Sequence, residues 1–161
     1  MKKLLLLIPA ITLLTVLSTT NFRANAHDDS ANIPHIDSHH NFPPTRADIV
    51  RHTFEIHVPK NSNPLTQVII QVPEVVNWSN KTKDLVVTDG NGKKVTPNVS
   101  INGKVIVLSF AESIAPNTDL EIDIKNVRRV TLGNGPVYRL LAKLEGSETP
   151  IHLGTVGFRL K

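Results

Sequence analysis

The chain has 161 residues, no cysteine, 20% charged residues and a formal net charge of +4 at pH 7. This length fits one domain behind a leader, and the lack of cysteine excludes both disulfides and a lipid-modified N-terminal cysteine. Aromatic residues make up only 4% of the chain, so it offers no stripe of aromatic and basic residues for binding nucleic acid.

Residues 1–26 are predicted to be a cleavable secretory signal peptide. Lys2 and Lys3 form a positive start, an apolar run from Leu4 to Leu17 follows, and Ala24-Asn25-Ala26 matches a signal-peptidase site. The apolar run is shorter than the roughly 20 residues that cross a bilayer. We therefore expect an exported protein, periplasmic or extracellular, with no membrane span in the mature chain. Without the leader, basic and acidic residues nearly balance, which argues against a nucleic-acid partner.

Residues 27–47 are rich in histidine, aspartate and proline and are predicted to be a flexible segment. Four of the seven histidines of the chain lie in it: His27, His35, His39 and His40. Cleavage after Ala26 would make His27 the N-terminal residue, whose α-amine and imidazole could chelate copper or zinc. The spacing of the four histidines does not match a closed structural zinc site. Two interpretations stay open, a copper or zinc site built from these histidines and a solvated spacer.

Residues 48–161 are predicted to form one all-β domain, because apolar and polar residues alternate with a period of two. The alternating segments, bounded by proline, glycine or asparagine, are 51–59, 65–73, 84–95, 98–110, 119–127, 137–145 and 151–161. Asn102-Gly103 predicts a two-residue type I′ turn inside the segment 98–110. We expect an antiparallel, immunoglobulin-like β-sandwich of seven or eight strands. Its predicted core residues are Phe54, Ile56, Val68, Ile70, Leu108, Phe110, Ile122, Ile124 and Leu140.

The order of these strands and turns resembles a secreted cyanobacterial family known as domain of unknown function 2808. The residues that carry the resemblance are His52–Pro59, Asn63–Ile70, Ala115–Thr118, Leu120–Ile124, Asn126, Gly135–Tyr138 and Leu153–Arg159. It extends over about residues 50 to 160 and implies an exported all-β module. The family has no assigned catalytic residues, so the resemblance transfers no site. A longer aromatic-rich region often precedes the first strand in the family, whereas this chain has the histidine-rich segment.

The candidate catalytic groups form no recognisable set. No serine lies in a Gly-x-Ser-x-Gly turn beside His52, His57 or His152. His52 and His57 are five residues apart on one predicted strand, which places them on opposite faces, and we interpret them as sheet-surface or edge histidines. Glu121 and Asp123 share a strand face and are interpreted as a solvated pair. We therefore predict that the protein is not an enzyme and needs no cofactor.

Two functions are compatible with the sequence. The first is an exported, non-enzymatic β-sandwich module that binds a cell-envelope or extracellular protein or polysaccharide through a face or an edge of the sandwich. The alternative is a periplasmic copper- or zinc-binding protein that uses His27, His35, His39 and His40. The sequence does not predict the oligomeric state.

Overall fold

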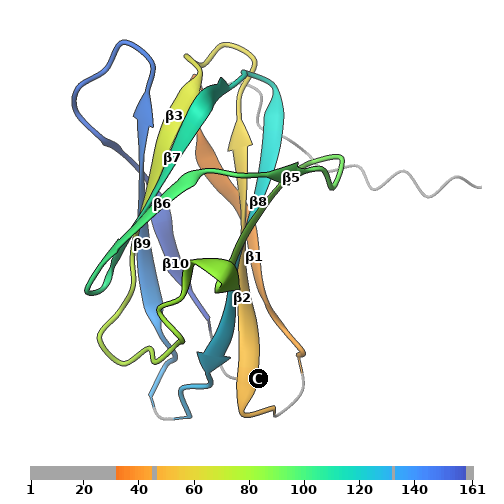
Figure 1. Ribbon diagram of the computed structural model, residues 1–161, viewed down its shortest axis with the longest axis vertical. Coiled ribbons are helices and arrows are strands. Elements are labelled where there is room, and N and C mark those ends of the chain that lie inside the picture. The colour runs from red at the N-terminus through yellow and green to blue at the C-terminus, as the bar shows by residue number, and fades with distance from the viewer. Residues whose placement is uncertain (1–31, 45–46, 132, 159–161) are drawn as a thin grey trace, which may run out of the picture.

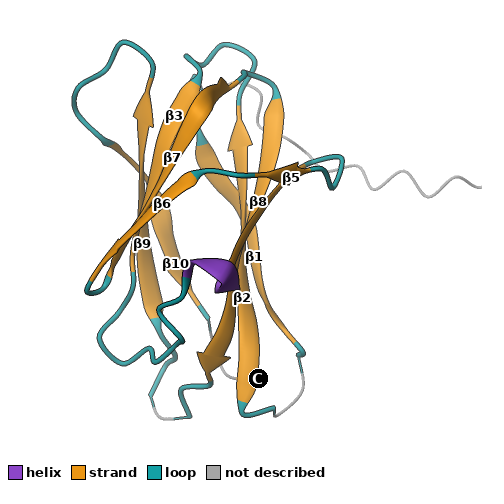
Figure 2. Cartoon of the chain, viewed as in Figure 1, coloured by secondary structure: helices purple, strands orange, loops and turns teal. Residues whose placement is uncertain are grey.

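The computed structural model describes residues 32–44, 47–131 and 133–158. Two antiparallel sheets of five strands face each other, with the strand orders β1-β2-β8-β4-β5 and β10-β9-β3-β7-β6 (Figures 1 and 2). The strands are β1 (His35–Phe42), β2 (Ile49–Val58), β3 (Leu65–Gln71), β4 (Leu85–Asp89), β5 (Lys94–Val95), β6 (Asn98–Asn102), β7 (Val105–Ile114), β8 (Thr118–Arg128), β9 (Val137–Leu144) and β10 (Ile151–Gly157). A short 3₁₀ helix, η1 (Thr82–Asp84), precedes β4. The predicted antiparallel β-sandwich is confirmed, but it has ten strands in the described residues rather than seven or eight. The two additional strands are β1, which lies in the polar segment before residue 48, and β5, which has only two residues.

The core lies between the two sheets and is filled by every second residue of the strands. All nine predicted core residues are buried. In β2, for example, Phe54, Ile56 and Val58 are fully covered, whereas Glu55 between them is partly exposed. Burial of one such aliphatic or aromatic side chain stabilises the fold by about 1.5–3 kcal/mol, so the alternation determines which face of each strand turns inward.

An aromatic cluster at the core contains a histidine. The ring of His52 stacks on Phe158 with centroids 4.0 Å apart and a 7° interplanar angle, and Phe54 and Tyr138 complete the cluster. His52 Nδ1 lies 2.8 Å from the Tyr138 hydroxyl. His52 and His57 do face opposite sides of the sheet, but each is only 4% exposed, so the interpretation as surface histidines is wrong for both. His57 lies against Asp119 and His35, and His52 lies in the core. The His52 ring is apolar enough to pack among aromatic rings once Tyr138 satisfies the buried nitrogen.

The strand β1 was not predicted, because it lies in the segment expected to be flexible. His35–Phe42 pair antiparallel with β2 along the free edge of the sheet, and a bulge interrupts the register between Ile36 and Ser38. Ile36 packs against Gly154 of β10, where an added Cβ would come within 2.9 Å of Ile36 Cδ1. For these residues the expectation of a flexible segment is corrected: β1 belongs to the sandwich and closes it on the side of β10.

The hairpin between β6 and β7 is predicted correctly, but its turn is displaced by one residue. Asn102 pairs with Val105, so the two loop residues are Gly103 and Lys104 rather than Asn102 and Gly103. Gly103 has a φ of 60° at the first loop position, which fits a type II′ turn. The Lys104 amino group donates hydrogen bonds to the backbone carbonyls of Glu74 and Val76, at 3.2 and 2.6 Å.

Candidate binding face

The outer face of the sheet that contains β1, β2, β8 and β4 is polar, and we call it the outer polar face. It is formed by the alternate residues that turn away from the core. They are Ser38 and His40 of β1, Arg51, Thr53, Glu55 and His57 of β2, Thr88 of β4, and Asp119, Glu121 and Asp123 of β8. Several of these side chains are fixed by hydrogen bonds to the next strand.

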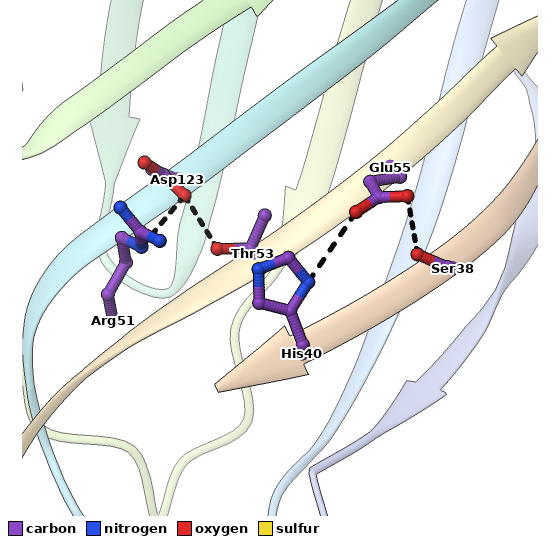
Figure 3. A network of polar contacts seen from close by, with 6 residues as sticks. All are labelled: Ser38, His40, Arg51, Thr53, Glu55 and Asp123. Carbon is purple, nitrogen blue, oxygen red and sulfur yellow. Dashed lines mark hydrogen bonds and ion pairs between the residues drawn. The ribbon is translucent and has the colours of Figure 1, made fainter. Parts of the chain in front are cut away.

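Two polar contacts, both made to the side chain of Asp123, join β2 to β8 (Figure 3). The Thr53 hydroxyl donates to Asp123 Oδ1 at 2.6 Å, and Arg51 Nε lies 3.3 Å from the same oxygen. Asp123 is 5% exposed, so the interpretation of Glu121 and Asp123 as a solvated pair is wrong for Asp123. A buried carboxylate needs a charged or hydrogen-bonding partner, and it has both. The Arg51 guanidinium also lies over the Phe42 ring, 5.3 Å from its centroid.

A second set of contacts joins β1 to β2. Ser38 Oγ donates to Glu55 Oε2 at 2.5 Å, and His40 Nδ1 lies 3.5 Å from Glu55 Oε1 (Figure 3). Further along the face, His57 Nδ1 lies 2.6 Å from Asp119 Oδ1, and the His35 ring meets the His57 ring edge-on with centroids 5.5 Å apart. These contacts fix the orientation of the carboxylates of Glu55 and Asp119.

A pocket of about 560 Å³ opens on this face near the β4–β5 turn. Its lining residues are Asp37, Glu55, Ile56, Thr88, Asp89, Gly90, Gly92, Asp119, Leu120 and Glu121. Five of them carry carboxylates, and the lining contains no lysine, arginine or aromatic side chain. We call it the acidic pocket. At Gly90, an added Cβ would lie 3.1 Å from Asp119 Cβ, so a larger residue would crowd Asp119 in the lining.

The turn beside the acidic pocket is held by one of its carboxylates. Asp89 Oδ1 accepts hydrogen bonds from the backbone amides of Asn91 and Lys93, at 3.0 and 2.8 Å. The sequence shows the turn residues and the alternating acids of β8, but it does not show that they meet. The meeting depends on β4 pairing with β8, a strand about 30 residues later in the chain.

The predicted metal ligands of β1 contact different residues. His35 contacts His57, His40 contacts Glu55, and His39 Nε2 lies 3.2 Å from the Gly157 carbonyl oxygen at the β10 edge. Across residues 32–44, 47–131 and 133–158, no group of three or more histidine or acidic side chains is placed to hold a metal ion. His27 lies outside the described residues, so a chelate at the N-terminus stays a prediction.

In the part of the chain that the structure describes, no helix is long and apolar enough to cross a membrane.

The fold is that of an antiparallel β-sandwich and is similar to that of bacterial adhesin domains. The N-terminal domain of a Streptococcus gordonii adhesin matches with a TM-score of 0.51 and 12% identity, over 80% of this chain and 32% of that one. The collagen-binding domain from a Staphylococcus aureus adhesin has a TM-score of 0.46 and 10% identity, over 78% and 94% of the two chains. The chain thus spans about a third of the first of these structures, and identities this low establish a likeness of fold alone.

The chain belongs to the family described as protein of unknown function DUF2808, whose model matches residues 31–134. The family resemblance is confirmed, but the matched range differs from the predicted 50–160. It begins before β1 and ends before β9, so β1 is part of the family domain. No curated protein matches the sequence.

Proposed function

We propose that the protein is an exported, non-enzymatic binding module, and that a cell-envelope or extracellular protein docks on its outer polar face at the acidic pocket. The observation that carries this proposal is the composition of the pocket lining, in which five of the ten residues that surround about 560 Å³ are acidic and none is lysine or arginine. Such a surface favours a partner that brings lysine or arginine side chains.

Preorganisation of the pocket supports this binding role. Glu55 is held by Ser38 and His40, and Asp119 is held by His57, so these carboxylates keep their positions without a ligand. Groups that are already ordered lose less entropy on binding. A polysaccharide is a weaker fit, because the lining has no aromatic face on which a sugar ring could stack.

The proposal is tested by NMR titration of the protein with an octalysine peptide. We expect amide shifts clustered at Thr88, Gly90 and Glu121, and weaker binding for the double variant Asp37→Asn, Glu121→Gln. The charge-matched control is Glu145→Gln, Glu148→Gln, which alters exposed acids of the β9–β10 loop. Equal losses in the two double variants, or shifts spread evenly over the surface, would contradict a defined site.

The copper or zinc alternative is tested at the N-terminus, because the proposed chelate combines the α-amine and the imidazole of His27. Export and cleavage after Ala26 would be seen as an intact mass that begins at His27. If the His27 chelate exists, one alanine inserted before His27 should abolish tight Cu(II) binding while it keeps every side chain. An unchanged Cu(II) affinity would remove this alternative.

A further inference from the structure

Exposed apolar side chains gather at one end of the sandwich. The large hydrophobic residues that are more than half exposed in the described part of the chain are Ile33, Phe42, Ile49, Val75 and Val137. All except Ile33 lie where β1, β3, β8 and β10 end and β2 and β9 begin. The register shows this directly, since Phe42 pairs with Arg51, Ile49 with Arg128, and Val137 with Gly157. Val75 lies in the β3–β4 loop, two residues before Asn77, which bridges to Arg128.

The four arginines of the described residues lie at the same end. Arg51 and Arg128 pair with the exposed apolar residues, Arg129 N donates to the Asp48 carbonyl at 2.8 Å, and Arg139 pairs with the last residue of β3. We call this region the arginine end. Its members are Phe42, Ile49, Arg51, Val75, Arg128, Arg129, Val137 and Arg139.

Within the described residues, most of the positive charge at the arginine end is uncompensated. Arg51 forms an ion pair with Asp123, but among the described residues Arg128, Arg129 and Arg139 have no carboxylate within ion-pair distance. The buried Nε of Arg129 has no hydrogen-bond partner there either. The acidic residues close in sequence to members of the arginine end are Asp48 and Glu74. These two acids are fewer than the four arginines.

We propose that the arginine end docks on the surface of a bilayer that contains anionic lipid. Cationic side chains beside exposed apolar ones fit this partner, because arginines bind the phosphate groups while the apolar side chains enter the boundary of the acyl chains. Nucleic acid would match the charge but not the exposed aliphatic groups. The proposal concerns a different surface from the acidic pocket, which lies beside the β4–β5 turn and the start of β8, at the opposite end of that strand.

The first test is sedimentation of the exported protein with vesicles of phosphatidylglycerol and phosphatidylcholine in equal parts, and with phosphatidylcholine alone. We expect binding to the anionic vesicles that weakens as salt is raised, and much weaker binding to the neutral ones. Equal binding to both vesicles, or none to the anionic vesicles, would overturn the proposal.

The second test compares two variants that each remove two exposed cations. Arg128→Ser, Arg139→Ser should weaken binding to the anionic vesicles about 30-fold, because each cation near such a surface contributes on the order of fivefold. Lys93→Ser, Lys94→Ser, at the β4–β5 turn, should weaken it less than about threefold. All variants share residues 1–31, so the comparison isolates the arginine end. Equal losses would show unspecific charge attraction and would overturn the proposal.

A third variant tests the apolar part. Ile49→Ser, Val137→Ser changes two exposed side chains and no charge. We expect weaker binding to the anionic vesicles with an unchanged dependence on salt. If this variant binds the anionic vesicles as well as the wild type does, the proposal that apolar side chains enter the bilayer is overturned. We expect every variant to keep the fold, because all the replaced side chains are exposed. Circular dichroism of each variant checks this.

Discussion

His52 is a titratable group inside the core, and it should make stability depend on pH. Burial, and secondarily the charge of Arg129, lower the pKa of His52 from 6.5 to about 4. Between these values the unfolded chain binds a proton that the folded chain does not, so the free energy of unfolding falls as the pH falls. The contribution of His52 is complete above pH 6.5, and about 3 kcal/mol of it should be lost by pH 4. Urea unfolding at several pH values measures this loss.

The matched variant is His52→Phe, which keeps a ring stacked on Phe158 but cannot bind a proton. Its stability should change less between pH 6.5 and pH 4 than that of the wild type. It loses the hydrogen bond to Tyr138, so its stability at neutral pH should be lower by about 1–3 kcal/mol. A wild-type and a variant curve with the same slope would show that another group titrates.

The alternation of the sequence predicts the face of His52 but not its environment. His52, Phe54 and Ile56 are every second residue of one strand, so the alternation predicts that they share a face. The structure places all three side chains inward. The partner that makes this burial possible is Tyr138, 86 residues away on β9. No local pattern shows that two such residues meet, because this depends on how the two sheets pack.

At the scale of the element, β1 differs most from the sequence-based prediction. The segment is polar, and the bulge between Ile36 and Ser38 breaks the period of two that identifies a strand. β1 forms because β2 offers an unpaired edge and Ile36 finds a place against Gly154. The acidic pocket was missed for a similar reason, since the sequence does not give the order of strands in a sheet.

The strand β1 should therefore be protected and should contribute to stability. We expect slow hydrogen exchange for those backbone amides of residues 38–42 that donate to β2. Deletion of residues 27–40 should lower the thermal midpoint, because it exposes the β2 edge and removes the contact of Ile36. A flexible segment, as predicted from the sequence, could be deleted without a change in the thermal midpoint. Rapid exchange throughout residues 38–42 would support that view and contradict the strand.

At the scale of the whole molecule, the β4–β5 turn and the start of β8 lie toward one end of the long axis of the sandwich, and the end of β8 lies toward the other (Figure 1). Strands β2 and β8 run between them, with Asp119 at the acidic pocket and Arg128 at the arginine end. Docking of the arginine end on a bilayer would therefore leave the acidic pocket directed away from the lipid, where a protein partner can reach it. The rigidity of the sandwich would keep the two surfaces apart.

That rigidity requires both sheets to share one core, and this can be measured. Leu108 of β7 and Ile122 of β8 are fully buried, one in each sheet. Leu108→Ala and Ile122→Ala should each lower the free energy of unfolding by about 2–5 kcal/mol, since each leaves a cavity. Fluorescence of Trp78, the single tryptophan, and far-UV circular dichroism should report coincident transitions in both variants. Separate transitions for the two probes would mean that one sheet unfolds before the other, and the sandwich could then not hold its two ends in a fixed relation.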